Sequence, residues 1–192
     1  MHKARLEAFS DGVIAILITI MVLELKTPQG IEWGALRPVA PTLLSYVLSF
    51  VYLGIYWNNH HHMLHTVDRV NGKILWANLH LLFWLSLVPY ITNWTGQNHF
   101  APVPTAMYGV ALLMSGWAYK ILQGCIIHHQ GRDSKLAVAV GSDVKGKISL
   151  AFYAIAIPVA LFVHPWISGG LYALVALMWL VPDRRIEKRL AT

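Results

Sequence analysis

The amino-acid sequence predicts an all-α membrane protein with six transmembrane helices in a single domain, residues 1–192. Hydrophobic residues make up 56% of the chain and charged residues only 12%, whereas a soluble domain carries about 25% charged residues. The net charge of +6 does not indicate a nucleic-acid partner, because the basic residues lie in alternate connections between apolar runs. The single cysteine, Cys125, excludes an intrachain disulfide and a cysteine metal cage.

Six apolar runs are the expected spans, because about 20 residues cross the hydrocarbon core of a bilayer. They cover residues 9–25, 42–57, 74–93, 107–127, 148–163 and 167–181. We expect the first run to be a retained helix rather than a signal peptide, because Glu7 and Asp11 interrupt its start. The last two runs are short, and His164-Pro165-Trp166 between them predicts a tight turn. This hairpin either thins the membrane or packs inside an oligomer.

Lysine and arginine predict the orientation, since both are enriched in cytoplasmic connections. Two of them, Lys26 and Arg37, lie on the expected outer side, and Lys120 lies in the inner half of the fourth run, where it is able to snorkel toward the cytoplasm. The other twelve lie on the expected cytoplasmic side: Lys3, Arg5, Arg69, Lys73, Arg132, Lys135, Lys145, Lys147, Arg184, Arg185, Lys188 and Arg189. Both termini are therefore predicted to be cytoplasmic.

The first run has two chemically different sides. At 100° per residue, Ile16, Thr19, Ile20 and Leu23 share one face, which Phe9 continues inward. Ser10 and Asp11 point about 120–140° away from that face by the same geometry. An ionisable residue inside a span needs a partner or a function, because its insertion costs roughly 2.5–3.5 kcal/mol.

Polar residues at the inner ends of the next two spans are the expected partners. The second run continues into Trp57-Asn58-Asn59-His60-His61-His62, and the third contains Trp76, Asn78 and His80. All of them lie at about the depth of Arg5 and Asp11 in the predicted topology. Because buried polar groups in lipid must find partners, we expect a hydrogen-bonded network that joins three helices. A structural role for Asp11 is favoured over a direct ion or proton site.

A set of residues in the first three runs resembles the transmembrane protein 175 family in its single-repeat bacterial form. The first helix opens with the motif Arg5-x-x-x-Phe9-Ser10-Asp11. The resemblance continues through Ala15-Ile16, Thr19, Val22-Leu23-Glu24, Tyr56-Trp57, Asn59-His60, Asn78 and Pro89. It covers the first half of the chain, and the last three runs match only in pattern.

This resemblance implies a potassium-permeable channel of the bacterial inner membrane, a multi-pass homotetramer whose first helices line a central pore. Ile16 maps onto the narrowest ring, Ile20 and Leu23 onto further aliphatic rings, and Thr19 onto a position that contributes to cation preference. Potassium is the permeant ion, no cofactor is expected, and no enzyme activity is implied. The family lacks a carbonyl selectivity filter, and this sequence contains no Thr-Val-Gly-Tyr-Gly-like segment.

The support network of the pore helix and its outer end complete the expected site. The resemblance places Arg5, Ser10 and Asp11 in a network that holds the pore helix. The partners expected for it are Phe9, Trp57, Asn59, His60, Asn78 and His80. Glu24 follows the aliphatic face by one residue, so it either concentrates cations at the outer mouth or is a solvated helix end.

Two other classes of function remain open from the sequence. His61-x-x-x-His65, beside His60 and His62, resembles one histidine box of a membrane metalloenzyme, because imidazoles at i and i+4 share a helical face. Known sites of that kind need several boxes. A secondary transporter would show repeated halves, and none is visible here. A serine nucleophile at Ser10 is disfavoured, because neighbouring residues on a helix point about 100° apart.

Overall fold

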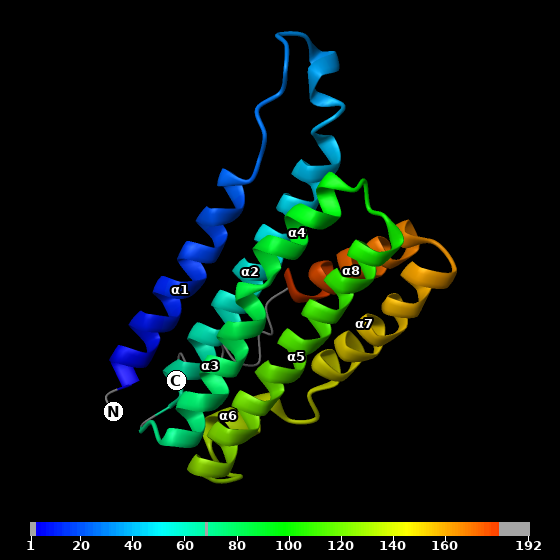
Figure 1. Ribbon diagram of the computed structural model, residues 1–192. Helices are drawn as coiled ribbons and strands as arrows, with labels where there is room; N and C mark the ends of the chain where they lie inside the picture. Colours follow the sequence, from blue (N-terminus) through cyan, green and yellow to red (C-terminus); the bar gives the residue numbers. More distant parts are fainter. Residues whose placement is uncertain (1–2, 68, 181–192) are drawn as a thin grey trace.

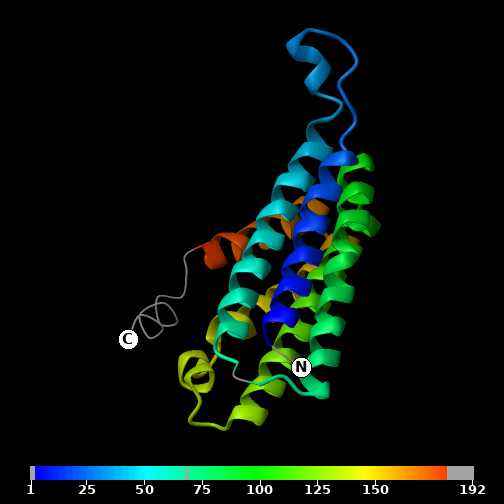
Figure 2. The same cartoon turned by 90° about the vertical axis from the view of Figure 1, so that its left-hand side faces the viewer.

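The computed structural model describes residues 3–67 and 69–180, and these residues form an all-helical bundle (Figures 1 and 2). The helices in chain order are α1 (Lys3–Leu23), η1 (Trp33–Leu36), α2 (Ala40–His65), α3 (Gly72–Ser86), α4 (Val88–Gln97), α5 (Pro102–Gln130), α6 (Lys135–Val140), α7 (Val144–Phe162) and α8 (Pro165–Leu180). The basic residues Arg184, Arg185, Lys188 and Arg189 lie outside the described residues, as does the end of the predicted run 167–181.

Five segments are long and apolar enough to cross a membrane, which confirms an all-helical, multi-pass membrane protein. They are Lys3–Leu23, Ala40–His65, Gly72–Gln97, Pro102–Gln130 and Val144–Phe162. The sixth predicted run forms α8, a shorter apolar helix of 16 residues. At about 1.5 Å per residue it is shorter than a hydrocarbon core of about 30 Å. In Figures 1 and 2, α8 runs obliquely across the bundle, so a sixth complete crossing stays a prediction.

The helices extend beyond the predicted runs at their polar ends. α1 begins at Lys3 instead of residue 9, and α2 continues to His65 instead of ending at residue 57. Helical hydrogen bonds satisfy the backbone wherever the chain enters the bilayer, so polar side chains do not end a helix there. The apolar runs therefore marked where lipid surrounds each helix, and not where the helix ends.

The third predicted run, 74–93, is divided at Leu87 into α3 and α4. Pro89 is the cause, because its ring displaces the carbonyl of the residue four positions earlier, Leu85, and it has no N–H to donate. The interruption leaves the two halves within one continuous span, Gly72–Gln97. In contrast, Pro158 lies inside α7 without dividing it.

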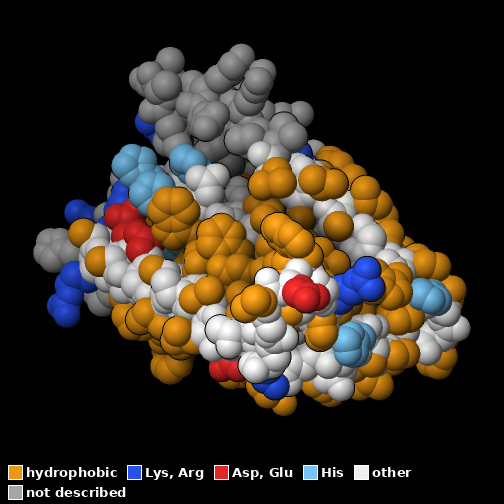
Figure 3. Space-filling view, turned by 90° about the horizontal axis from the view of Figure 1, so that it is seen from above, with side chains coloured by type: hydrophobic (Ala, Val, Ile, Leu, Met, Phe, Trp, Pro, Cys, Tyr) orange, Lys and Arg blue, Asp and Glu red, His pale blue; other side chains and the backbone are white. Residues whose placement is uncertain are grey.

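The bundle is organised around α5, which packs against α3 and α4 on one side and against α7 and α8 on the other. The first helix lies at the edge of the bundle, where it packs on α2, α3 and α4 (Figure 1). One apolar core joins α1, α2, α3 and the C-terminal half of α5, and a second core joins α2, α4, the N-terminal half of α5, α7 and α8. On the end of the bundle that Figure 3 shows, apolar side chains are widespread among the described residues.

The tight turn predicted at His164 is confirmed, because α7 ends at Phe162 and α8 begins at Pro165. The two helices form a hairpin that packs within the chain on α5, and α8 also contacts α2. The Ser168 hydroxyl donates to the Ala156 carbonyl at 2.7 Å, and the Tyr172 hydroxyl donates to the Thr105 carbonyl at 3.1 Å. Backbone carbonyls thus satisfy Ser168 and Tyr172, whereas the Tyr153 hydroxyl of the same hairpin donates to the Tyr52 hydroxyl.

Candidate functional site

One side of α1 is buried against the rest of the chain. Leu6, Ser10, Ile14, Leu17 and Met21 are the buried residues of this helix. Their spacing of three to four residues places all of them on one face, which packs on α2, α3 and α4. Ser10 is fully buried among these aliphatic side chains, so its hydroxyl needs a partner inside the bundle.

The opposite side of α1 is apolar and exposed. Ile16 is 57% exposed, Ile20 42% and Leu23 80%, and Phe9 is also exposed in the N-terminal part of the helix. The sequence placed these residues on one face, and none of the described residues, 3–67 and 69–180, covers that face in the structure. An apolar helix face at membrane depth contacts either lipid or another protein surface.

Thr19 lies on the exposed face between Ile16 and Ile20. Its hydroxyl donates to the carbonyls of Ala15 and Ile16, at 3.1 and 3.0 Å. Because a hydroxyl has two acceptor lone pairs in addition to its proton, the Thr19 oxygen can still accept a hydrogen bond or coordinate a cation. The exposed face therefore carries one oxygen ligand within an aliphatic surface.

A hydrogen-bonded chain of three buried side chains holds the other side of α1. The Asn78 amide of α3 donates to the Ser10 hydroxyl at 2.9 Å, and its oxygen lies 2.7 Å from His60 Nε2 of α2. All three side chains are buried. Each of three helices thus contributes one residue, as the sequence predicted for Ser10, His60 and Asn78.

A second contact joins the predicted network to α2. The Trp57 indole N–H donates to the Asp11 carboxylate at 3.1 Å, and the Trp57 ring is stacked on His61 with ring centroids 6.1 Å apart. Asp11 is half-buried at the edge of the α1–α2 contact. Its partner is an indole donor instead of a cation, which agrees with the structural role expected for this carboxylate.

Four residues expected in the network lie apart from it. Arg5 and Phe9 are exposed, and neither takes part in a hydrogen bond with the described residues. Asn59 donates to the Ile55 carbonyl of its own helix at 2.8 Å. His80 accepts from the Trp84 indole within α3 at 3.0 Å. None of these four therefore joins the chain of hydrogen bonds between Ser10, Asn78 and His60.

Glu24 follows the last residue of α1 and is exposed. Its carboxylate accepts a hydrogen bond from the Asn93 amide of α4 at 2.9 Å. This contact connects the C-terminal end of α1 to the middle of α4. It also leaves the second carboxylate oxygen available to solvent.

The histidine run at the C-terminal end of α2 forms a stack of rings. His61 and His65 are stacked with centroids 6.2 Å apart, so the i, i+4 spacing does place both rings on one face. Among residues 3–67 and 69–180, no group of three or more His, Cys, Asp or Glu side chains is arranged to hold a metal ion. The histidine box of the metalloenzyme alternative therefore has no additional ligands in the described part of the chain.

Two polar contacts in the structure were not predicted from the sequence. Lys120, expected to snorkel, forms an ion pair with Asp143 at 3.1 Å. The Ser49 hydroxyl lies 2.6 Å from the Thr92 hydroxyl and 2.8 Å from the Tyr108 hydroxyl, which joins α2, α4 and α5. A helix N-cap signal at Asp143, which follows Gly141-Ser142, was the available clue to the first contact.

Comparison with known proteins decides the family. Residues 5–89 match the family described as the endosomal/lysosomal potassium channel TMEM175. A protein named as a potassium channel, from Chryseobacterium sp. (strain P1-3), is 58% identical over 190 residues, which cover 99% of this chain and 98% of that protein. The chain belongs to the TMEM175 family. The family predicted from the motif Arg5-x-x-x-Phe9-Ser10-Asp11 is thereby confirmed.

The fold of this TMEM175 chain is also that of a solved structure. The crystal structure of a lysosomal potassium-selective channel TMEM175 homolog from Chamaesiphon minutus matches with a TM-score of 0.82 and 27% identity. The match covers 94% of this chain and 97% of that chain. The endosomal/lysosomal proton channel TMEM175 of Gallus gallus is 30% identical over 109 residues, which are 50% of this chain but only 22% of that protein.

Proposed function

We propose that this chain forms a potassium-permeable channel, a homotetramer in which four copies of α1 surround a central pore. The observation that carries the proposal is the exposed aliphatic face of α1, with Ile16, Ile20 and Leu23 uncovered by their own chain. Four such faces around an axis would cover one another and enclose a narrow passage. The relatives support this reading, because two of the proteins similar along nearly the whole chain are named as potassium channels.

Four copies of Ile16 would form the narrowest ring, a dry constriction that closes by dewetting. Ile20 and Leu23 would add further aliphatic rings toward the outer end. When the helices tilt or rotate, the ring widens and water re-enters. A cation then passes partly dehydrated, and the Thr19 hydroxyls replace some of its lost water. No enzyme chemistry and no cofactor take part in this passive conduction.

The preference for potassium follows from the cost of dehydration. Potassium gives up water more easily than sodium, so an aliphatic ring favours potassium without coordinating it. The exposed oxygen of Thr19 adds a weak ligand next to that ring. Because no carbonyl filter segment exists in the sequence, the selectivity is expected to be modest.

The buried chain Ser10–Asn78–His60 and the Asp11–Trp57 contact would hold the back of each pore helix. Both contacts lie on sides of α1 other than the one carrying Ile16, so they can set the rotation of α1 without entering the pore. Glu24 lies at the outer end, where its free carboxylate oxygen would attract cations to the mouth.

The proposed location is a bacterial inner membrane, with both termini in the cytoplasm. The connection after α2 and the one containing α6 lie at the same end of the bundle as the start of α1 (Figure 1). These segments and the first turns of α3 and α7 carry eight of the eleven lysines and arginines among the described residues. Lys26 and Arg37 lie in the connection that contains η1, at the other end. This distribution follows the rule that basic connections stay inside.

Ion flux from liposomes tests the proposal. Purified protein is reconstituted, and potassium flux is compared with sodium flux for the wild type and for Ile16→Asn. We expect potassium-favouring flux in the wild type and a larger, less selective flux in Ile16→Asn, because the polar side chain keeps the constriction wet. Val22→Asn is the matched control: Val22 is also an exposed aliphatic residue of α1, and it lies about 120° around the helix from Ile16. Absence of flux from folded wild-type protein would contradict the channel, and equal effects of both variants would contradict the role of Ile16.

A further inference from the structure

A cavity of about 430 Å³ lies away from α1, between α2, α5, α6, α7 and α8. None of the described residues of α1 lines it. Its volume falls in the range of small-molecule sites, roughly 300–1,000 Å³. Because the candidate pore residues take no part in this cavity, it is separate from the proposed pore.

Aromatic side chains from four helices form much of the cavity wall. They are Tyr52, Tyr56, Tyr119, Tyr153 and Trp179. The rings of Tyr56 and Tyr119 meet edge to face, with centroids 6.2 Å apart. Aromatic rings attract one another in such arrangements beyond the effect of buried area alone. A rigid ring also loses less conformational freedom on binding than an alkyl chain does. The wall therefore favours a ring compound.

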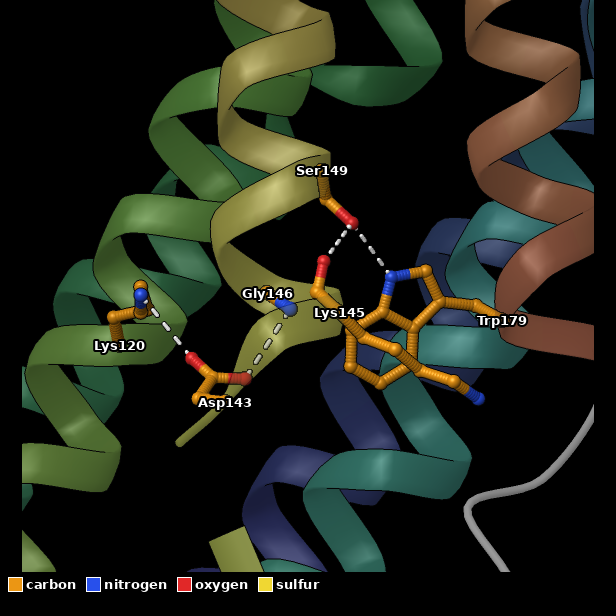
Figure 4. A network of polar contacts seen from close by, with 6 residues as sticks. All are labelled: Lys120, Asp143, Lys145, Gly146, Ser149 and Trp179. Carbon is orange, nitrogen blue, oxygen red and sulfur yellow. Dashed lines mark hydrogen bonds and ion pairs between the residues drawn. The ribbon is translucent and has the colours of Figure 1, made fainter. Parts of the chain in front are cut away.

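The charged groups of the cavity wall are paired or point away from its polar end (Figure 4). The Lys120 ammonium pairs with one carboxylate oxygen of Asp143 at 3.1 Å, and the other carboxylate oxygen accepts the Gly146 backbone N–H at 3.2 Å. The Lys145 ammonium lies 5.8 Å from the centroid of the Trp179 ring and points beyond it, away from the Lys120–Asp143 pair. A charged ligand would lose its hydration here without gaining an uncompensated partner, so an uncharged ligand is favoured.

The polar groups beside Trp179 are also satisfied within the chain. The Trp179 indole N–H donates to the Ser149 hydroxyl at 2.8 Å, and that hydroxyl donates to the Lys145 carbonyl at 2.8 Å (Figure 4). On the opposite wall, the Tyr119 hydroxyl donates to the Asn59 carbonyl at 3.1 Å. These groups give the cavity its shape, and each already has a partner.

The Tyr56 hydroxyl is different, because it lines the cavity and forms no hydrogen bond with residues 3–67 and 69–180. It lies close to α5, since a Cβ atom added at Gly116 would be 3.7 Å from its oxygen. A phenolic hydroxyl both donates and accepts hydrogen bonds. It can therefore pair with either a hydroxyl or a carbonyl group of a ligand.

From these features we propose that the cavity binds one uncharged ring compound whose hydroxyl or carbonyl group forms a hydrogen bond with the Tyr56 hydroxyl. The ring lies among the aromatic side chains of α2, α5, α7 and α8. A membrane quinone and a soluble phenol share this chemistry. The bound ring would connect α2 to α7 and α8 without entering the proposed pore.

Binding of 2-naphthol to detergent-purified protein tests this inference without any measurement of ion flux. Naphthalene, which has the same rings and no hydroxyl, is the comparison ligand. Tyr56→Phe should weaken 2-naphthol binding about threefold to tenfold, which is the effect of one lost hydrogen bond. It should leave naphthalene binding unchanged, because the ring of residue 56 remains. Equal effects on the two ligands would contradict the inference.

Tyr90→Phe is the matched control for the loss of a hydroxyl. Tyr90 of α4 is exposed and does not line the cavity. Its replacement should leave the affinity for 2-naphthol unchanged. An equal loss of affinity in Tyr56→Phe and Tyr90→Phe would contradict the inference.

A charged analogue tests the preference for an uncharged ligand. 2-Naphthoate has the same rings and a carboxylate in place of the hydroxyl. After correction for partition into protein-free micelles, it should bind the wild type at least about tenfold more weakly than 2-naphthol, because its carboxylate must be desolvated beside a lysine that is already paired. Equal or tighter binding of 2-naphthoate would overturn the inference.

A further variant fills the cavity and keeps Tyr56. Ala139 of α6 lines the cavity, so Ala139→Phe should weaken 2-naphthol binding at least about tenfold through overlap with the ligand. Val138→Phe is its control, because Val138 is exposed on the same helix and does not line the cavity. Melting temperatures confirm that both variants fold. Unchanged binding in folded Ala139→Phe would contradict the inference.

Competition then identifies the source of the ligand. Displacement of 2-naphthol by a short-chain quinone indicates a membrane quinone, and displacement by p-cresol alone indicates a soluble phenol. Displacement by neither would overturn the inference.

Discussion

The α1 side of the molecule and the α7–α8 side satisfy their buried polar groups in different ways. On the α1 side, Ser10, Asn78 and His60 bind one another through their side chains. On the α7–α8 side, the hydroxyls of Ser168 and Tyr172 donate to backbone carbonyls. Every residue has a backbone carbonyl, so a hydroxyl that donates to a carbonyl requires a particular residue only at the donor position. The hydrogen-bonded chain of Ser10, Asn78 and His60 requires three particular residues on three helices.

This difference explains where the chain is recognisable from its sequence. The family match covers residues 5–89, which contain Ser10, His60 and Asn78. The last three spans resembled the family only in their hydrophobic pattern, and they combine hydroxyl-to-carbonyl bonds with side-chain pairs such as Tyr153–Tyr52. The predictions below test whether the α1 side depends on side-chain partners and the α7–α8 side on close packing.

The largest effect is expected from Asn78→Leu. This change leaves the hydroxyl of Ser10 and the ring nitrogen of His60 without partners in a buried site, so the free energy of unfolding should fall by about 2–4 kcal/mol. Unfolding in detergent, followed by circular dichroism, measures it. Asn93→Leu is the control, because its amide binds only the exposed Glu24 and Gln97 side chains, and it should cost less than about 1 kcal/mol. Equal losses of unfolding free energy in the two variants would mean that the buried hydrogen bonds of Asn78 stabilise the fold no more than the exposed ones of Asn93.

On the α7–α8 side, Gly109→Ala should lower the free energy of unfolding by about 1–3 kcal/mol through overpacking. A Cβ atom at Gly109 would overlap the Tyr172 hydroxyl and lie 3.0 Å from Ile157 Cγ1. Gly124→Ala, in the same helix, meets no atom within 4 Å and should instead stabilise α5 by roughly 0.5–1 kcal/mol. Melting temperatures of the two variants give the comparison.

Adding Tyr172→Phe to Gly109→Ala sharpens this test. Removing the hydroxyl relieves part of the overlap, so the double variant should be less destabilised than the sum of the two single changes. Strict additivity would show that the Tyr172 ring moves away freely, and that close packing at Gly109 does not hold α8.

The smallest effect is expected from Lys120→Met. The Lys120–Asp143 pair is partly exposed, with 29% and 19% of the two side chains accessible, so its loss should cost about 0.2–1 kcal/mol after solvent screening. The cost should shrink between low and high salt, because salt screens an exposed pair. Lys147→Met, at an exposed residue of α7, controls for the charge. If the loss of unfolding free energy in Lys120→Met did not change with salt, its cause would be the lost packing of the aliphatic part of the lysine side chain and not the lost ion pair.

The sequence alone determined the features that depend on local periodicity. The two faces of α1 follow from a helical repeat within one segment, so Ile16, Ile20 and Leu23 were correctly grouped apart from Ser10. The apolar runs located five membrane-crossing segments, because the bilayer sets their length and not their partners. The tight turn at His164 followed from a proline and polar residues between two apolar runs.

Only the tertiary structure decided which side chains meet. Arg5, Asn59 and His80 have the right depth and chemistry for the network, but the rotation of each helix turns them away from it. That rotation is set by packing between helices distant in the chain, such as α5 against α3 and α7. For the same reason the tyrosine-lined cavity and the Lys120–Asp143 pair were not visible in the sequence: each requires residues from several helices to converge, and no local pattern records how two helices are turned relative to one another.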